Sequence, residues 1–490
     1  MITAAEEAPL KLPGKSVMWA AADSGGGMVV TMASMLMLAR MMTPAEFGTG
    51  ALVIGAIGLV NFYVEGLFHD ALIQTLDADD DLYAAAVRLG CMVALGVVAI
   101  GLVFALASTH TAWAQAAWLF TVTSLVLPVN AALGVCNARM RRDLIFREVA
   151  RASLAGKIGG AIIGVGLAIS GAGVWSLIGQ CMAGIIIQTV LLFAQSGWRP
   201  PVRGSIRAVW PICRFALPYA FMNSLSALRS QLFLLMVAGV LTLAASGYVN
   251  VAFRLTTTPQ LVLIAAFVSL GLPLLSRHQG SPKNMERSFV EFTQLVSVTT
   301  LPAFVGLCLT ANDAVPVLLG DKWVTVVPLV QILAIGAALT FLRFPSSAVL
   351  RSLGYVRYSF ASSVFQLLFT VIGMAVIRPH DLTVAVWLWV APVALQLPVA
   401  AIAVTRRSSI TFKVLLGSLL PATFATIAMS VVVVLVSIRL PSASPAFRLF
   451  CEVAAGATTA GLSLLLFDGK RYRAILHPKS ARTRMTEAKS

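Results

Sequence analysis

The sequence has few charged residues for its length. Only 11% of its 490 residues are Asp, Glu, Lys or Arg, whereas a soluble globular domain has roughly 25%. Such a chain cannot cover its surface with polar groups, which excludes a soluble globular protein. Apolar residues make up 58% of the chain and the mean hydropathy is +0.88, so most of the chain is suited to lipid.

Residues used by enzymes and metal sites are scarce. The five histidines are scattered, and the six cysteines include no CxxC pair and no metal-ligand spacing. The acidic run Asp77–Asp81 is interpreted as a solvated turn, because no further ligands cluster near it. A membrane-embedded glycan polymerase or ligase needs positioned carboxylates or histidines, or a sizeable outer loop, and no acidic pair occupies an outer loop except the separated Asp313 and Asp321. We therefore predict no catalytic residue, no metal site and no enzymatic activity.

Long apolar blocks are abundant instead. Blocks of about 20 residues match a hydrocarbon core roughly 30 Å thick, and at this length they predict helices rather than barrel strands, because a backbone in lipid must satisfy its own hydrogen bonds. We predict an all-α, polytopic membrane protein of about 14 transmembrane helices. The predicted spans are 17–40, 49–68, 83–107, 112–136, 149–170, 173–195, 213–240, 246–274, 289–310, 324–343, 359–377, 382–405, 413–438 and 446–467.

The positions of the cations predict the orientation. With the N-terminus inside, 28 of the 36 Lys and Arg fall in inner segments. The outer segments hold only Arg40, Lys322, Arg378, Arg439 and Arg448. Positive charge accumulates on the cytoplasmic side of membrane proteins, so both termini are predicted to be cytoplasmic. The net charge of +16 is thereby explained without a nucleic-acid partner.

Two pairs of similar turns indicate an internal repeat. Thr43–Gly48 follows the first span much as Ala244–Tyr248 follows the seventh, and Arg139–Phe146 is similar to Arg351–Phe360. Duplicated six-helix lobes around a midplane cavity are a common transporter plan. The predicted segments are an N-lobe of six helices at 1–211, a C-lobe of six helices at 212–405, two further helices at 406–468 and a basic cytoplasmic tail at 469–490.

Four stretches resemble the polysaccharide flippases of the multidrug, oligosaccharidyl-lipid and polysaccharide exporter superfamily. They are Leu38–Gly48, Gly247–Leu255, Leu318–Trp323 and Pro328–Leu333, and they occur in the family's order and spacing. The resemblance implies a two-lobed transporter in the bacterial inner membrane that flips undecaprenyl-diphosphate-linked oligosaccharides by alternating access, for exopolysaccharide or lipopolysaccharide biosynthesis.

The resemblance also implies partners. These are the lipid-linked glycan, membrane lipids, and a polysaccharide polymerase with a chain-length regulator. The match departs from the family in the seventh span, where members often carry an Asp and this chain has Ser230–Leu232. Any ion-coupling role of that helix is therefore in doubt.

Three cations fall inside predicted spans: Lys157, Arg229 and Arg254. A charge at the bilayer centre costs about 2.5–3.5 kcal/mol on insertion scales, so such residues usually face a cavity or a partner. Ammonium and guanidinium groups bind phosphate, and a cavity lined by these cations would hold a diphosphate headgroup. The alternative for each is a position nearer an interface, from which the side chain snorkels or pairs with a local acid.

Asp23 in the first span precedes a glycine triplet, Gly25, Gly26 and Gly27. Each Gly weakens a helix by about 1 kcal/mol relative to Ala, so the triplet predicts a bend beside a protonatable group. The alternative is that the glycines permit close helix packing. Asp23 is the candidate if an acid couples transport to an H⁺ or Na⁺ gradient; no other cofactor is expected.

Glu65, with His69 and Asp70, closes the second span. These side chains are interpreted either as interfacial residues or, for Glu65, as a second coupling acid. Three other functions remain open: a cation-coupled multidrug exporter of the same fold, a lipid II flippase, and a membrane-embedded polymerase or ligase. The intramembrane cations favour the glycan-lipid flippase over the drug exporter, whose cavity would be richer in acids and aromatics.

Overall fold

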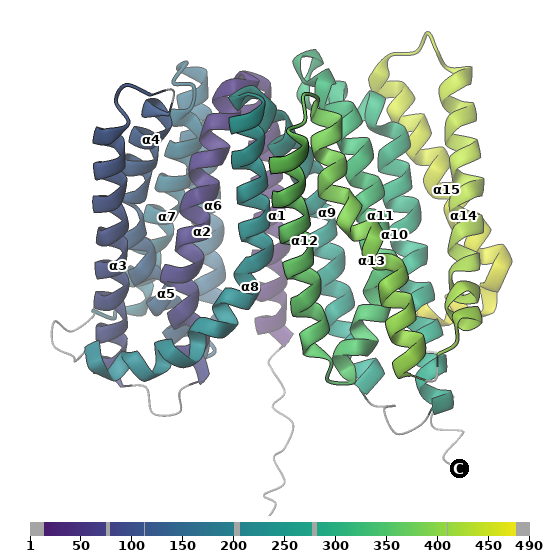
Figure 1. Cartoon of the computed structure of the whole chain (residues 1–490), viewed down its shortest axis with the longest axis horizontal. Coiled ribbons are helices and arrows are strands. Elements are labelled where there is room, and N and C mark those ends of the chain that lie inside the picture. Colours follow the sequence, from purple (N-terminus) through teal and green to yellow (C-terminus); the bar gives the residue numbers. More distant parts are fainter. Residues whose placement is uncertain are drawn as a thin grey trace, which may run out of the picture. The chain divides into compact units, whose positions relative to one another are not determined.

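The chain forms long helices in two compact units. The computed structural model describes residues 14–74, 79–111, 113–199, 206–276, 282–408 and 410–476. Contacts divide the chain into unit 1, Met1–Leu235, and unit 2, Met236–Ser490. Within each unit the long helices run side by side (Figure 1). The predicted segment boundaries at residues 211, 405 and 468 stay predictions.

Unit 1 holds seven complete α-helices and most of an eighth. They are α1 (Gly14–Met41), α2 (Pro44–Gln74), α3 (Asp80–Ala107), α4 (Ala114–Ser124), α5 (Leu127–Arg142), α6 (Phe146–Ile169), α7 (Trp175–Ser196) and α8 (Ile206–Val240), which continues into unit 2.

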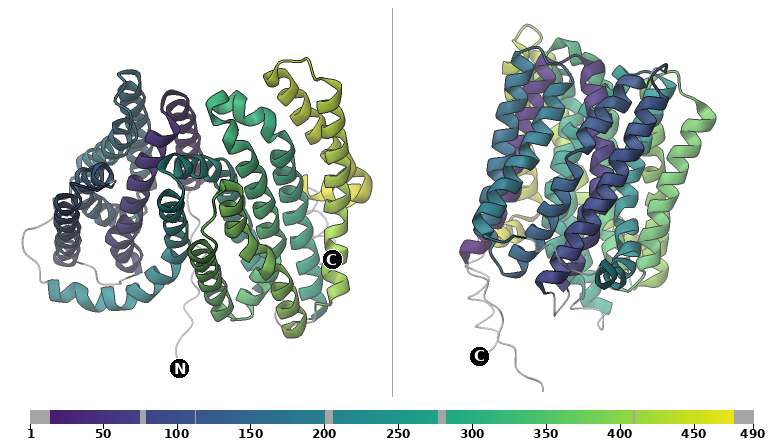
Figure 2. Two further views of the ribbon diagram at one scale, coloured as in Figure 1. Left: turned by 45° about the horizontal axis from the view of Figure 1, so that its top comes forward. Right: turned by 90° about the vertical axis from the view of Figure 1, so that its left-hand side faces the viewer.

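Unit 2 contains the remaining helices. They are α9 (Leu243–Ser276), α10 (Pro282–Leu319), the 3-10 helix η1 (Asp321–Val326), α11 (Val327–Ser352), α12 (Val356–Ile377), α13 (Leu382–Arg407), α14 (Phe412–Arg439) and α15 (Pro445–Leu476). Figure 2 gives two further views of the same helices.

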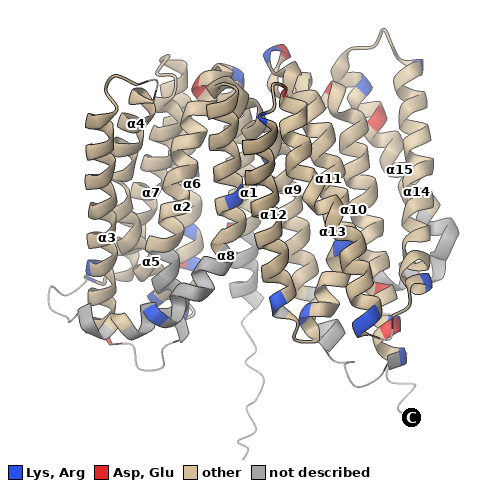
Figure 3. Ribbon diagram, viewed as in Figure 1, with Lys and Arg blue, Asp and Glu red and all other residues tan. Residues whose placement is uncertain are grey.

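Every predicted span corresponds to a helix or to a pair of consecutive helices. Among the described residues, eleven segments are long and apolar enough to cross a membrane, and α4 with α5, and η1 with α11, each count as one. The prediction of an all-α, polytopic membrane protein is therefore confirmed. Most charged residues lie toward the helix ends (Figure 3).

Several helices extend beyond the predicted spans. α10 runs from Pro282 to Leu319, where the apolar block predicted 289–310, and α11 continues to Ser352 rather than ending at residue 343. The fourth predicted span is interrupted instead. Pro128 at the start of α5 has no N–H to donate, and its ring would clash with the carbonyl four residues earlier, at Ser124. The helix accordingly stops at Ser124 and restarts at Leu127.

The turn before α2 is a capping box. The Thr43 N–H donates to Oε2 of Glu46 at 2.8 Å, and the Glu46 N–H donates to Oγ1 of Thr43 at 3.3 Å. Pro44, the first helical residue, needs no hydrogen bond there. A methyl group on Gly173, whose φ is +55°, would lie 2.6 Å from Oε1 of Glu46. The first flippase-like stretch therefore starts α2 and lies against the turn before α7.

The acidic run also has a structural role. Oδ1 of Asp79 accepts a hydrogen bond from the Leu82 N–H at 2.8 Å and so caps α3. Oδ1 of Asp80 lies 2.7 Å from Nη1 of Arg139 on α5. These contacts fix the start of α3 against the end of α5, and Asp77 lies outside the described residues.

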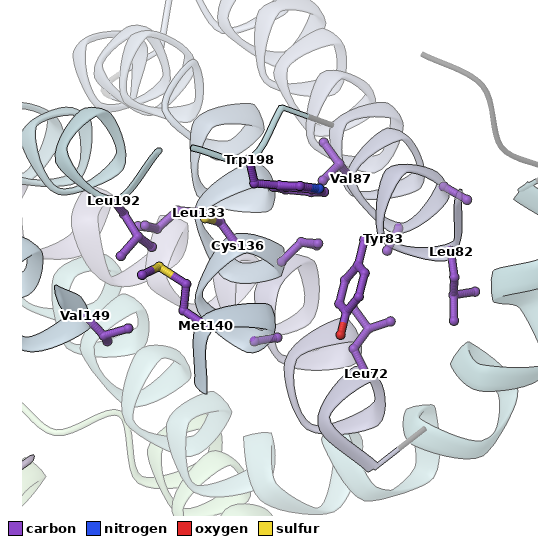
Figure 4. Close-up of a cluster of buried hydrophobic side chains, with 14 of the residues drawn as sticks. Leu72, Leu82, Tyr83, Val87, Leu133, Cys136, Met140, Val149, Leu192 and Trp198 are labelled. Carbon is purple, nitrogen blue, oxygen red and sulfur yellow. The ribbon is translucent and has the colours of Figure 1, made fainter. Parts of the chain in front are cut away.

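One buried cluster joins six helices of unit 1 near this cap. Side chains from α2, α3, α5, α6, α7 and α8 converge there, and the Trp198 ring lies over the same cluster (Figure 4). Trp198 stacks on Phe193 with ring centroids 6.0 Å apart, and the Arg139 guanidinium lies 5.2 Å from the Trp198 ring centroid. Cation–π contacts of this kind tie a polar helix end to an apolar core.

α6 and α7 approach each other closely through glycines. A methyl group on Gly156 would lie 2.6 Å from the carbonyl oxygen of Gly184, and one on Gly160 would lie 2.5 Å from the carbonyl oxygen of Gln180. With Gly164, these residues form a small-xxx-small pattern, which lets helix backbones meet in lipid, where van der Waals packing rather than the hydrophobic effect drives association.

The two units repeat one packing pattern. In unit 1, α5 packs against α2, α3 and α7, and α4 packs against α2 and α3; in unit 2, α11 packs against α9, α10 and α13, and η1 against α9 and α10. The turns after α5 and α11 also agree. The N–H of Ile145 donates to Met140 and that of Tyr355 to Leu350, both at 2.9 Å, and each turn contains a positive φ, at Leu144 (59°) and Gly354 (83°).

Candidate functional site

Asp23 and Lys157 form an ion pair inside unit 1. Nζ of Lys157 on α6 lies 3.2 Å from Oδ1 of Asp23 on α1 and 3.5 Å from its carbonyl oxygen. The side chains are 37% and 19% exposed, respectively. From the sequence, Lys157 was predicted to bind cargo, with pairing to a local acid as one alternative, and Asp23 was predicted separately as a coupling acid. In the fold these two residues form one ion pair.

Aromatic contacts hold the same two helices together. The guanidinium groups of Arg147 and Arg151 on α6 lie 6.0 and 5.4 Å from the ring centroid of Trp19 on α1. Such contacts contribute about 0.5–1 kcal/mol each at exposed sites. These contacts hold α6 against α1 on the N-terminal side of the ion pair in each helix.

The glycine triplet shapes this pair. A methyl group on Gly27 would lie 2.2 Å from Nζ of Lys157 and 2.9 Å from its Cδ, so Gly27 makes room for the lysine stem. Gly26 faces Leu154 at an ordinary 3.4 Å, and Gly25 has nothing within 4 Å. α1 continues as one helix from Gly14 to Met41. Close approach therefore accounts for Gly27, while the role of the triplet as a hinge stays a prediction.

Arg229 is buried on α8, with 6% of its surface exposed. The polar residues on either side of it contact α2. The hydroxyls of Tyr63 and Ser224 lie 2.5 Å apart, and a methyl group on Gly55 would lie 2.2 Å from Oε1 of Gln231. This stretch of α8 thus lies against α2 of unit 1.

Arg254 lies on α9 in unit 2. Its Nε donates to Oδ1 of Asn250, one turn earlier, at 3.1 Å. The adjacent Phe253 packs against Trp389 of α13, with ring centroids 4.8 Å apart. Both Asn250 and Arg254 belong to the second flippase-like stretch, so this stretch positions a guanidinium.

The predicted group Glu65, His69 and Asp70 is only partly described. These residues lie in α2, but their side chains are outside the described part of the structure.

Two of the flippase-like stretches meet in unit 2, where Tyr248 packs edge-on against Trp323 with ring centroids 5.8 Å apart. Trp323 is completely buried, so these motifs also stabilise the fold.

Unit 2 contains a polar network that was not predicted from the sequence. Nη1 of Arg343 on α11 donates to Oε1 of Gln396 on α13 at 2.8 Å and to Oγ of Ser362 on α12 at 2.7 Å. Ser362 and Gln366 also donate to Oε1 of Gln396, both at 2.8 Å, and Nε2 of Gln396 donates to the Ser362 carbonyl at 2.9 Å. The network joins three helices of one unit.

A signal for this network was present in the sequence. Arg343 was placed at the inner end of a span, because only charges were counted and the span was predicted to end there. Gln366 and Gln396 interrupt otherwise apolar blocks, and an amide in lipid requires partners just as a charge does. Counting amides as well as charges would have indicated Gln366 and Gln396 as polar positions in two consecutive spans.

The chemistry of these groups suits anion binding and proton or cation exchange. Within the described part of the chain, no three His, Cys, Asp or Glu side chains are placed to hold a metal ion. Among the three predicted cations, Lys157 is hydrogen-bonded to Asp23 and Arg254 to Asn250. Lys157 and Arg229 belong to unit 1 and Arg254 to unit 2.

Comparisons with known sequences agree on one family. A family model described as "Polysaccharide biosynthesis protein" matches residues 37–328. The succinoglycan biosynthesis transport protein ExoT of Rhizobium meliloti is 24% identical over 325 residues, which cover 66% of this chain and 65% of ExoT. The lipopolysaccharide biosynthesis protein WzxC of Escherichia coli is 22% identical over 342 residues, or 68% of each chain. The chain thus spans about two thirds of the length of these relatives.

Solved structures share the fold. The lipid II flippase MurJ in an inward closed conformation superposes with a TM-score of 0.74 at 12% identity, over 94% of this chain and 100% of that chain. An outward-facing multidrug resistance transporter of the MATE family, in the MOP superfamily, gives a TM-score of 0.51 at 15% identity, over 80% of this chain and 95% of that chain. At these identities the similarities show the fold alone.

Proposed function

Because the chain belongs to the polysaccharide biosynthesis protein family, on a match over residues 37–328, we propose that it flips undecaprenyl-diphosphate-linked oligosaccharides across the bacterial inner membrane. It does so by alternating access, and the cargo serves exopolysaccharide or lipopolysaccharide biosynthesis. The names of ExoT, a transport protein, and WzxC, a lipopolysaccharide biosynthesis protein, support this assignment. The protein catalyses no covalent step, and bond formation by the purified chain would overturn that part of the proposal.

In this proposal, the Asp23–Lys157 pair binds and releases the diphosphate headgroup. An ammonium held by one carboxylate in an apolar helix pair, and still 37% exposed, can exchange that carboxylate for a phosphate oxygen. A diphosphate offers more negative charge than one carboxylate, and charge-assisted hydrogen bonds to phosphate are strong. Lys157 therefore binds the cargo headgroup, and Asp23 takes Lys157 back, or binds H⁺ or Na⁺, when the cargo leaves.

Arg229 and Arg254 bind phosphate in the same proposal. A guanidinium contacts phosphate through two parallel donors, which an ammonium cannot do. Arg229 is buried on α8, and Arg254 is positioned by Asn250 in unit 2.

Deletion of the gene tests the function. Lipid-linked repeat units are expected to accumulate on the inner face of the membrane while surface polymer disappears; unchanged polymer would end the proposal. Complementation then tests the site. Arg229→Ala is expected to fail at normal protein level, whereas Arg287→Ala serves as a matched control, because Arg287 on α10 is 73% exposed and pairs with Glu291 on its own helix.

A lipid II flippase is the second candidate, favoured by the fold shared with MurJ. Lipid II carries the same diphosphate headgroup, so the cations fit both cargoes. The two functions separate in the deletion strain, where loss of lipid II flipping would stop cell-wall synthesis and loss of repeat-unit flipping would spare it.

The proposed topology places both termini on the cytoplasmic side of the inner membrane. The excess of inner-segment cations supports it. Protease or thiol-reagent access to terminal tags in sealed spheroplasts tests it: tags protected until the membrane is permeabilised are expected, and tags reached in intact spheroplasts would reverse the orientation.

A further inference from the structure

Unit 2 holds a second charged cluster, between α10 and α15. Nε of Arg448 donates to Oδ2 of Asp313 at 2.7 Å, and Nη2 of the same guanidinium donates to Oδ1. The side chain of Asp313 is 5% exposed and that of Arg448 is 23% exposed. Paired contacts of this kind satisfy both carboxylate oxygens and fix their geometry. Asp313 and Arg448 therefore neutralise each other.

Glu452 lies one helical turn after Arg448 and has no such counter-charge. Glu452 is 2% exposed, and its Oε2 has no hydrogen-bond partner among the described residues. The side chain lines a cavity of about 500 Å³ between α10, α11, α14 and α15. A buried carboxyl group with one unpartnered oxygen is an unusual arrangement, because buried polar groups are normally hydrogen-bonded.

The rest of the cavity lining supplies no positive charge. α10 contributes Asn312 and the Cys308 thiol, α11 contributes Gln331, and α14 contributes Ser437. The charged groups near Glu452 are thus Asp313 across the helix interface and Arg448 on its own helix, and these two already balance. An ionised Glu452 would leave a net charge of −1 in a buried place, which is costly without a partner.

We propose that Glu452 on α15 is a proton-binding site, completed by the Asp313–Arg448 pair that joins α10 to α15. The carboxylate accepts one H⁺ to become a neutral carboxylic acid, and the charge on the three residues changes from −1 to 0. By the predicted orientation, Asp313 and Arg448 lie at the extracytoplasmic ends of their helices, so the proton enters from that side. Proton binding does not depend on the proposed flippase function, whereas its use in transport does.

Infrared spectroscopy of the full chain in lipid nanodiscs tests the site without any cargo. Wild-type protein is expected to show the carbonyl stretch of a protonated carboxyl group at neutral pH, and Glu452→Gln is expected to lose it. Glu291→Gln is the matched control, because Glu291 on α10 is 40% exposed and pairs with Arg287; this variant should keep the band. If wild type and Glu452→Gln give the same carboxyl spectrum at every pH, the proposal is wrong.

A second variant separates proton binding from a packing role. Asp313→Asn releases the Arg448 guanidinium, which then balances Glu452, so the carboxyl band is expected to disappear although Glu452 remains. Persistence of the band in a folded Asp313→Asn protein would contradict the proposed charge balance. A band that appears only when Na⁺ is removed would assign the site to a metal cation and also overturn the proposal.

Transport by the same variants is a separate readout. If Glu452→Gln loses the band and flips its cargo without pH dependence, the proton site is supported and transport uses it. If the band is lost and the purified chain flips no glycan lipid in any form, the proton site stands and the flippase proposal fails.

Discussion

Nζ of Lys157 on α6 lies 3.2 Å from Oδ1 of Asp23 on α1, which joins two residues 134 positions apart in the sequence. Both lie in apolar helices, and the lysine stem occupies the space that a side chain at Gly27 would fill. Neither residue can therefore be changed without consequence for the other.

A double-mutant cycle tests the pair. Asp23→Asn and Lys157→Met should each lower stability, and the double variant should cost less than the sum, with a coupling of about 0.2–1 kcal/mol because the pair is partly exposed. Thermal unfolding in nanodiscs measures the coupling. Lys157→Met should also abolish complementation, with or without Asp23→Asn; strictly additive stabilities, or an active Lys157→Met, would argue against the pair or its role.

Gly27→Ala tests whether the lysine position matters. The new methyl would meet Nζ and Cδ of Lys157 at 2.2 and 2.9 Å, and since these atoms end a flexible side chain, the ammonium should move away from Asp23 while the helices stay packed. Complementation should then fall as in Lys157→Met, at normal protein level. Gly25→Ala is the control: it meets nothing within 4 Å and should add up to about 1 kcal/mol of helix stability. Equal activity of both variants would remove the steric argument.

Gly160→Ala tests the close contact of α6 and α7. Its methyl would meet the Gln180 carbonyl oxygen at 2.5 Å and the Gly184 Cα at 3.0 Å. These are backbone atoms, so the helices must separate, at a cost of about 1–3 kcal/mol. Gly166→Ala on the same helix meets nothing within 4 Å. We expect a lower unfolding temperature for the first variant alone; similar temperatures for both would show that the contact is not tight.

Gln396→Leu tests the missed network. It removes the oxygen that accepts from Arg343, Ser362 and Gln366, and a hydrogen bond to a charged group is worth about 1.5–3 kcal/mol. The variant should therefore be destabilised by about that amount or more. Gln396→Glu keeps the acceptor and adds a counter-charge for the guanidinium, so it should retain stability. Denaturation of both proteins in nanodiscs distinguishes them, and a Gln396→Leu protein as stable as wild type would make the network dispensable.

Hydropathy predicted the helices well because each span is a local property. Every apolar block became a helix or a broken pair of helices, and the break at Pro128 follows from one missing N–H. Helix ends were predicted less well. α10 and α11 continue past their apolar blocks. Polar residues outside the hydrocarbon core can also be helical, so the end of an apolar block does not mark the end of a helix.

The candidate site was predicted only as separate residues. Lys157, Asp23 and Gly27 were each named from the sequence, but their contact depends on how α1 packs against α6. Gln366 and Gln396 are visible in the sequence as amides that need partners, but their pairing with Arg343 depends on how three helices pack together. Glu452 was not named, since a single acid near a predicted helix end shows neither its burial nor the partner of its neighbour Arg448.

The sequence by itself determined that this chain is a polytopic helical membrane protein, because the length and apolar character of each block fix what the backbone does in lipid. Only the tertiary structure decided which charges neutralise one another: Asp23 with Lys157 and Asp313 with Arg448, leaving Glu452. Electrostatic pairing depends on distances of a few ångströms between different helices, and those distances are set by side-chain packing rather than by hydropathy.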